Sequence, residues 1–216
     1  VQHPFTSSGI VVLPEKDSKN FKSVDITQDK ENLQAWRKTV SSAIDHTENP
    51  YELYMMVNKP YGLTFLKYSA PHLSKKDFSE ILSSAWIMCE APHNDPDVSL
   101  GKLVAMFQSA DPKVLMDEDE YRDFQRLGDM LTVYRGVTSY NADNIKALSW
   151  TLNQQTAEWF AHRFGEDGTV YEATIAKEHI FALFNRRNES EVIVDPKYLT
   201  DITEVQDMAS DFILSQ

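Results

Sequence analysis

Only one cysteine, Cys89, occurs among the 216 residues of the chain. A single cysteine excludes an intrachain disulfide framework and an all-cysteine metal site, and it is typical of a reducing compartment. No segment approaches the roughly 20 apolar residues that a membrane-spanning helix needs. The N-terminus also lacks the basic start and apolar run of a secretion signal. We therefore expect a cytoplasmic protein without a membrane partner.

Basic residues are scarce: Lys and Arg number 21 against 33 Asp and Glu, which gives a formal net charge of -12. Affinity for nucleic acid comes mainly from basic side chains that displace counterions from the phosphate backbone. A nucleic-acid partner is therefore disfavoured. Hydrophobic residues still make up 42% of the chain and aromatic residues 11%. That is enough material for a packed core and excludes wholesale disorder.

Several catalytic motifs are also missing, namely a Gly-rich phosphate loop, HExxH and GxSxG. The six histidines do not fall at metal-ligand spacing with one another, so we expect no bound metal. We interpret His93, with Asp95 and Asp97, as a solvated turn. Cys89 lies on the apolar stripe of a predicted helix, which favours a small core residue over a nucleophile.

Hydrophobic periodicity divides the chain into two regions. After an irregular start over residues 1–26, the region 1–125 is mainly helical by its apolar spacing, and the strongest helix opens at Ser74. The region 126–216 instead carries strand patterns, with a strand that stops at Gly136. We expect these strands at 131–134, 147–151, 169–175, 180–184 and 191–194, with a helix over 154–164. Helices followed by strands predict an α+β fold. The absence of a linker predicts that both regions pack as one unit.

Arg135 stands at the expected end of a strand, directly before Gly136. A guanidinium there can direct a planar fork of donors toward a phosphate. Gly136 would let a ligand approach the backbone closely. A strand-terminal arginine is also common as a surface or salt-bridge residue, and that alternative stays open.

Ser149 and Thr151 flank Trp150 in a short strand pattern. Strand alternation places the two hydroxyls on one face and the indole on the other. Hydroxyls so arranged can hydrogen-bond a sugar or an acidic side chain. The alternative is a polar strand face with Trp150 in the core.

Glu189 and Glu191 precede a very apolar run. Residues two apart on a strand share a face and lie about 6.6 Å from each other along it. Two such carboxylates can divide labour, one stabilising positive charge and one acting as a base. Two alternatives stay open, a solvated acidic pair and a carboxylate-pair hydrolase of another fold.

In their order along the chain, these motifs resemble the ADP-ribosyltransferases of the arginine–serine–glutamate class. That class has a strand-borne Arg, a Ser-Thr-Ser-like strand followed by a helix with an A-x-x-F pattern, and a Glu-x-Glu that leads into an apolar strand and a Pro. The chain supplies Tyr134-Arg135-Gly136, then Ser149-Trp150-Thr151 with Ala157-Glu158-Trp159-Phe160, then Glu189-Ser190-Glu191 followed by Val192-Ile193-Val194-Asp195-Pro196. The resemblance spans about residues 130–207 and departs from the pattern at the bulky Trp150. It looks closest to small phage-type transferases.

The resemblance implies a helical N-terminal portion packed on a mixed, mainly antiparallel β-sandwich of the ADP-ribosyltransferase type. It implies NAD as co-substrate, with cofactor binding assigned to Arg135, Gly136, Ser149 and Thr151. Ser149 would orient Glu191, and Glu191 would stabilise the positive charge that develops as nicotinamide leaves. Glu189 would act on the acceptor, as in class members that modify arginine.

The expected function is an NAD-dependent mono-ADP-ribosyltransferase that modifies a target protein, in the manner of phage or bacterial effectors acting on machinery in the host cytoplasm. The alternative is a non-catalytic, transferase-like module that binds a protein partner. Turnover of NAD separates these two functions.

Overall fold

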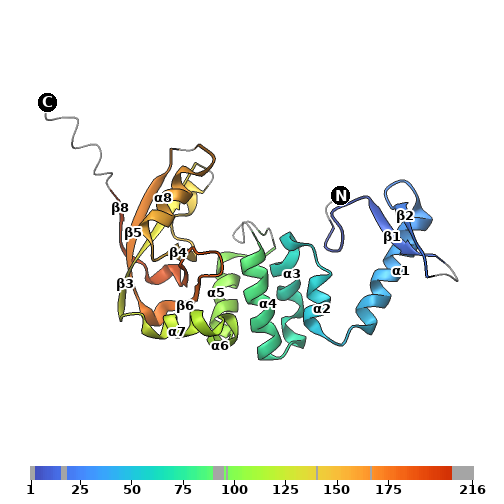
Figure 1. Cartoon of the computed structure of the whole chain (residues 1–216), viewed down its shortest axis with the longest axis horizontal. Helices are drawn as coiled ribbons and strands as arrows, with labels where there is room; N and C mark the ends of the chain where they lie inside the picture. Colours follow the sequence, from blue (N-terminus) through green and yellow to red (C-terminus); the bar gives the residue numbers. More distant parts are fainter. Residues whose placement is uncertain are drawn as a thin grey trace. The chain divides into compact units, whose positions relative to one another are not determined.

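The computed structural model describes residues 3–15, 19–89, 95, 97–139, 141–165 and 167–205. The chain forms two compact units, Val1–Ser99 and Leu100–Gln216 (Figure 1). The boundary expected after residue 125 falls inside the second unit, because three helices that begin before that residue belong with the strands. No helix in the described part of the chain is long and apolar enough to cross a membrane.

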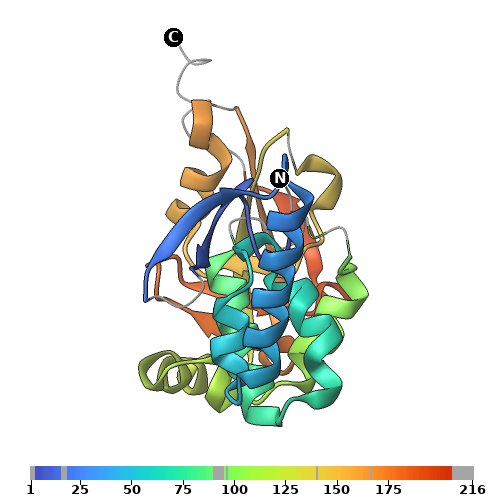
Figure 2. The same ribbon diagram turned by 90° about the vertical axis from the view of Figure 1, so that its right-hand side faces the viewer.

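The first unit contains a β-hairpin followed by helices. Its elements are β1 (Ile10–Pro14), β2 (Phe21–Asp25), α1 (Lys30–His46), α2 (Pro50–Met55), α3 (Gly62–Ser69) and α4 (Lys75–Met88). Alternation in β1 buries Val11 and Leu13 against Trp36 of α1, which lies beside the hairpin (Figure 2). The irregular start that we expected is therefore wrong. The predicted start of α4 is confirmed, because the Ser74 hydroxyl accepts a hydrogen bond from the backbone N–H of Asp77 at 3.1 Å.

The second unit combines helices with an antiparallel sheet, which confirms the α+β class. Its helices are α5 (Leu100–Ser109), α6 (Pro112–Leu115), α7 (Glu118–Arg126) and α8 (Gln154–His162). Its strands are β3 (Met130–Val137), β4 (Ser149–Thr151), β5 (Thr169–Ala176), β6 (Ile180–Phe184), β7 (Glu191–Val194) and β8 (Thr200–Glu204). The sheet order is β6-β7-β4-β3-β5-β8, and each adjacent pair is antiparallel. Three strands differ from expectation, since β3 continues through Gly136, β4 begins at Ser149 instead of Ala147, and β8 was not predicted.

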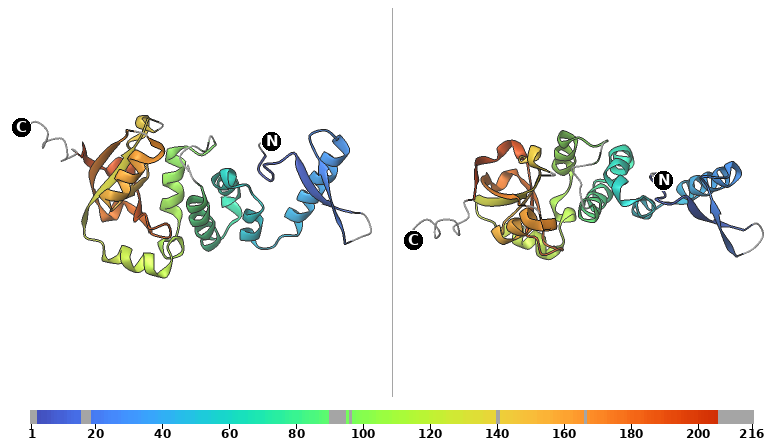
Figure 3. Two further views of the ribbon diagram at one scale, coloured as in Figure 1. Left: turned by 45° about the horizontal axis from the view of Figure 1, so that its top comes forward. Right: turned by 90° about the horizontal axis from the view of Figure 1, so that it is seen from above.

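A single register pair links the two halves of this sheet, β6-β7-β4 and β3-β5-β8. Strand β3 pairs with β5 along its whole length, whereas it pairs with β4 only at Tyr134 and Thr151. In the described residues, the expected sandwich is therefore one hydrogen-bonded sheet. The ladder between β3 and β4, at its middle, is only one residue pair long. Helix α8 lies along β3 and covers this junction (Figure 3). The predicted site residues gather where the halves part.

Candidate functional site

Arg135 lies at the point where β3 and β4 separate. Its Nη1 donates a hydrogen bond of 2.6 Å to the carbonyl oxygen of Ser149. In a longer antiparallel ladder such a carbonyl would accept from a backbone N–H of the neighbouring strand. The guanidinium of Arg135 donates in place of such an N–H. The carbonyl oxygen of Ser149 therefore keeps a hydrogen bond where the ladder between β3 and β4 ends. In the described part of the chain, Nε of Arg135 is buried and has no hydrogen-bond partner.

Electrostatics at Arg135 favour an anionic ligand. Burial lowers the pKa of Arg135 to about 10, the negative charge of Glu191 acts in the opposite direction, and the positive charge of Arg163 lowers the pKa further. The guanidinium therefore keeps its charge at neutral pH. A buried N–H donor without an acceptor costs free energy that a bound oxygen would recover. A phosphate or ribose oxygen has the required chemistry.

Ser149 and Glu191 are joined directly. The Ser149 hydroxyl donates a hydrogen bond of 2.5 Å to Oε1 of Glu191. The register of β4 and β7 pairs Thr151 with Glu191, so Ser149 reaches the carboxylate diagonally from two residues along its strand. The Glu191 side chain is only 8% exposed, which means that its position is fixed by the sheet. Arg135, Ser149 and Glu191 thus form a hydrogen-bonded chain across three adjacent strands.

Thr151 positions the loop that precedes β7. Its hydroxyl donates to the carbonyl oxygen of Glu189 at 2.6 Å and accepts from the backbone N–H of Asn153 at 3.0 Å. Asn153 is the N-cap residue of α8. One hydroxyl therefore ties the loop of residues 185–190, called the glutamate loop below, to the start of α8. Cofactor binding by Thr151 stays a prediction.

Glu189 does not share a strand face with Glu191, so that expectation is wrong. Strand β7 begins at Glu191, and Ser190 between the two glutamates has a φ of 45°, in the left-handed region. Strand alternation does not apply across such a residue. Arg187 brings the carboxylates together instead, with Nη2 2.9 Å from Oε2 of Glu189 and 3.7 Å from Oε2 of Glu191.

Gly136 is required for a reason that differs from the expected one. A Cβ atom at this position would lie 2.2 Å from the carbonyl oxygen of Ala157 and 2.6 Å from the backbone nitrogen of Ala161. Both atoms belong to α8, so the missing side chain makes room for the helix and not for a ligand. Contact between the backbone of Gly136 and a cofactor stays a prediction.

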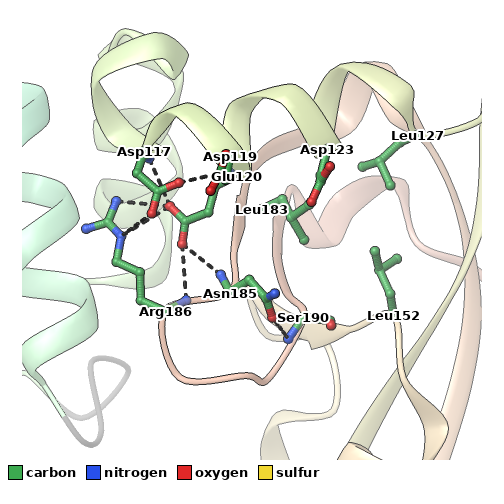
Figure 4. A pocket seen from close by; sticks show the side chains of 10 residues that line it. All are labelled: Asp117, Asp119, Glu120, Asp123, Leu127, Leu152, Leu183, Asn185, Arg186 and Ser190. Carbon is green, nitrogen blue, oxygen red and sulfur yellow. Dashed lines mark hydrogen bonds and ion pairs between the residues drawn. The ribbon is translucent and has the colours of Figure 1, made fainter.

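Glu120 on α7 anchors the other end of the glutamate loop (Figure 4). Its side chain is 3% exposed, and its Oε1 accepts from the backbone N–H groups of Asn185 and Arg186 at 2.8 and 3.2 Å. Its Oε2 accepts from Nη2 of Arg186 at 3.0 Å. Sequence reasoning missed this residue as part of the site. Its only sequence signal is the capping box with Asp117, which marks the start of α7.

A pocket of about 420 Å³ borders the same loop. Its lining has four carboxylates and one cation, Arg186, together with three leucines, Asn185 and Ser190 (Figure 4). Two of these residues, Leu152 and Ser190, directly adjoin Thr151 and Glu191 in sequence. Among the carboxylates are Asp119 and Asp123 of α7. Because negative charge repels phosphate, we expect an NAD pyrophosphate on the Arg135 side of the loop and not in this pocket.

The described residues give little support for metal binding or for a cysteine nucleophile. Among the described residues, no group of three or more His, Cys, Asp or Glu side chains could hold a metal ion. His93 lies outside the described residues. Cys89 is the half-buried C-cap residue of α4.

No family model, curated protein or solved structure matches this chain.

Proposed function

We propose that this chain is an NAD-dependent mono-ADP-ribosyltransferase that modifies a side chain of a target protein. The observation that carries the proposal is the hydrogen-bonded chain from Arg135 through Ser149 to Glu191. An arginine, a hydroxyl and a glutamate held in this order on neighbouring strands match the motif order of the transferase class. The single register pair between β3 and β4 supports a fold of the ADP-ribosyltransferase type, because beyond it Arg135 of β3 bonds the Ser149 carbonyl oxygen of β4 through its side chain.

The environment of each residue suits a distinct task. Nε of Arg135 is a buried donor that has no partner among the described residues, which fits the phosphate or ribose oxygens of NAD. Glu191, buried and held by Ser149, presents fixed negative charge where positive charge develops on the ribose. NAD supplies the ADP-ribosyl group and nicotinamide as its leaving group.

The two glutamates differ in exposure, which supports a division of labour between them. The side chain of Glu189 is 24% exposed, against 8% for Glu191. The more exposed carboxylate can reach a side chain of another protein and accept its proton. The buried one is better placed to act on the ribose.

Incubation of the full chain with NAD tests the proposal. We expect nicotinamide release, measured by chromatography, and ADP-ribose on one or a few proteins when lysate and labelled NAD are added. The absence of both would contradict the proposal.

A non-catalytic interaction module is the second candidate function. The observation that favours it is the outer face of the hairpin, where Ile10, Val12 and Phe21 are 62%, 58% and 70% exposed. Exposed apolar patches of this kind mark protein interfaces. Thermal stabilisation by NAD without any nicotinamide release would favour this candidate over the transferase.

A further inference from the structure

The loop between β6 and β7 places one of its own arginines on the two glutamates. Nη2 of Arg187 is within 4 Å of both carboxylates, 2.9 Å from Glu189 and 3.7 Å from Glu191. In the proposed function these carboxylates serve the acceptor and the ribose. A guanidinium of the chain itself therefore lies where the acceptor nitrogen of a target would have to lie.

The backbone on both sides of Arg187 holds it there. On one side, Glu120 accepts hydrogen bonds from the N–H groups of Asn185 and Arg186. On the other side, Asn188 and Ser190 have φ values of 57° and 45°, a conformation that turns the chain sharply and costs about 1 kcal/mol for a residue other than glycine. The loop is thus a defined turn that presents Arg187 to the carboxylates.

On the basis of the function proposed above, we propose that Arg187 is a self-modification site to which the chain transfers ADP-ribose from NAD. A terminal nitrogen of Arg187 forms a bond to the anomeric carbon of the nicotinamide-bearing ribose. The bond from that carbon to nicotinamide breaks, and nicotinamide leaves as a neutral molecule with the bonding electrons. The guanidinium gives up one proton to the carboxylate of Glu189. Atoms and charge balance without an oxidant or a reductant.

The strength of the ion pair is compatible with this role. The side chains of Arg187 and Glu189 are 41% and 24% exposed, and exposed ion pairs contribute about 0 to 1 kcal/mol. Arg187 can therefore exchange its contact with Glu189 for a contact with the ribose. An acceptor held beside the reacting atoms also has an effective concentration far above that of a dissolved target.

Peptide mapping by mass spectrometry tests the proposal on the full chain incubated with NAD, with nicotinamide release measured in the same sample. Arg122 is the internal control, because it is another exposed arginine and lies 2.6 Å from the carboxylate of Asp119. We expect at least about tenfold more ADP-ribose on Arg187 than on Arg122. Arg187→Gln should lose this label.

Each result decides between the two proposals. Nicotinamide release with no label on Arg187, or with equal label on Arg122, would overturn self-modification and leave the proposed function standing. No nicotinamide release would overturn the proposed function and self-modification with it.

A binding measurement without NAD gives a second, independent test. Agmatine, a small guanidinium compound, should bind Arg187→Gln about tenfold more tightly than the parent chain in calorimetric titration, because Arg187 no longer competes for the carboxylates. Equal affinity in both proteins would show that Arg187 does not occupy the acceptor position.

Discussion

The Ser149 hydroxyl donates a hydrogen bond of 2.5 Å to Oε1 of Glu191, although 42 residues separate them in the chain. The contact depends on the sheet order, which places β4 beside β7. On its other side, Ser149 offers its carbonyl oxygen to Arg135. One serine therefore connects the cation and the buried carboxylate of the proposed site.

Removal of the Arg135 side chain should weaken NAD binding. In Arg135→Ala the charge-assisted hydrogen bonds to the ligand are lost, which we expect to cost about 1.5 to 3 kcal/mol, or roughly 10- to 100-fold in affinity. Calorimetric titration measures the change, with circular dichroism to verify the fold and Arg122→Ala as an exposed control. Equal affinity in Arg135→Ala and the parent would exclude Arg135 from the NAD site.

Glu120 should contribute far more stability than its neighbour Asp119. Glu120→Ala removes the acceptor of two backbone N–H groups and of Arg186, so we expect a loss of about 2 to 3 kcal/mol in the free energy of unfolding. Asp119→Ala breaks only an exposed pair with Arg122 and should cost less than about 1 kcal/mol. Urea unfolding compares the two variants, and similar losses would contradict the anchoring role of Glu120.

The sequence predicted most of the central strands because their local patterns are strong. Strands 180–184 and 191–194 coincide with β6 and β7, since each is an apolar run bounded by polar residues or by Asp-Pro. The β-hairpin and β8 were missed. In β2 and β8 most side chains are exposed, so neither strand carries the apolar alternation that marks a strand in sequence.

The site was only partly predictable. The residues Arg135, Ser149 and Glu191 were found by motif order, but their mutual contacts depend on strand neighbours that no local pattern specifies. The position of Glu189 was misjudged, because nothing in the sequence marks Ser190 as left-handed. Glu120 was missed since the loop residues that it contacts lie 65 residues or more away in sequence.

Two glycines should respond oppositely to the same substitution. In Gly136→Ala the added Cβ meets the backbone of α8 at 2.2 Å, so we expect a loss of at least about 3 kcal/mol in the free energy of unfolding. In Gly101→Ala no atom of the described residues lies within 4 Å of the added atom, and the better helix propensity of alanine should stabilise α5 by up to about 1 kcal/mol. Thermal unfolding compares both variants with the parent, and a tolerated Gly136→Ala would contradict the close approach of α8.

The second unit should fold as residues 100–216 but not as residues 126–216. The shorter fragment lacks Phe107, Leu115 and Met116, which are buried in the unit, and it lacks the loop anchor Glu120. We expect a cooperative thermal transition for 100–216, and an insoluble or poorly folded product for 126–216, because about 90 residues make a small core. A cooperative transition in the shorter fragment would show that α5–α7 are dispensable for folding.

Nicotinamide release by the isosteric variants Glu191→Gln and Glu189→Gln tests the proposed division of labour most directly. Glu191→Gln removes the negative charge beside the ribose, so release into water and transfer to protein should both fall by several powers of ten, at about 1.4 kcal/mol of barrier for each power. Glu189→Gln should suppress transfer to protein and keep much of the release into water. Full nicotinamide release by Glu191→Gln, or equal small effects in the two variants, would contradict a transferase built on Glu191.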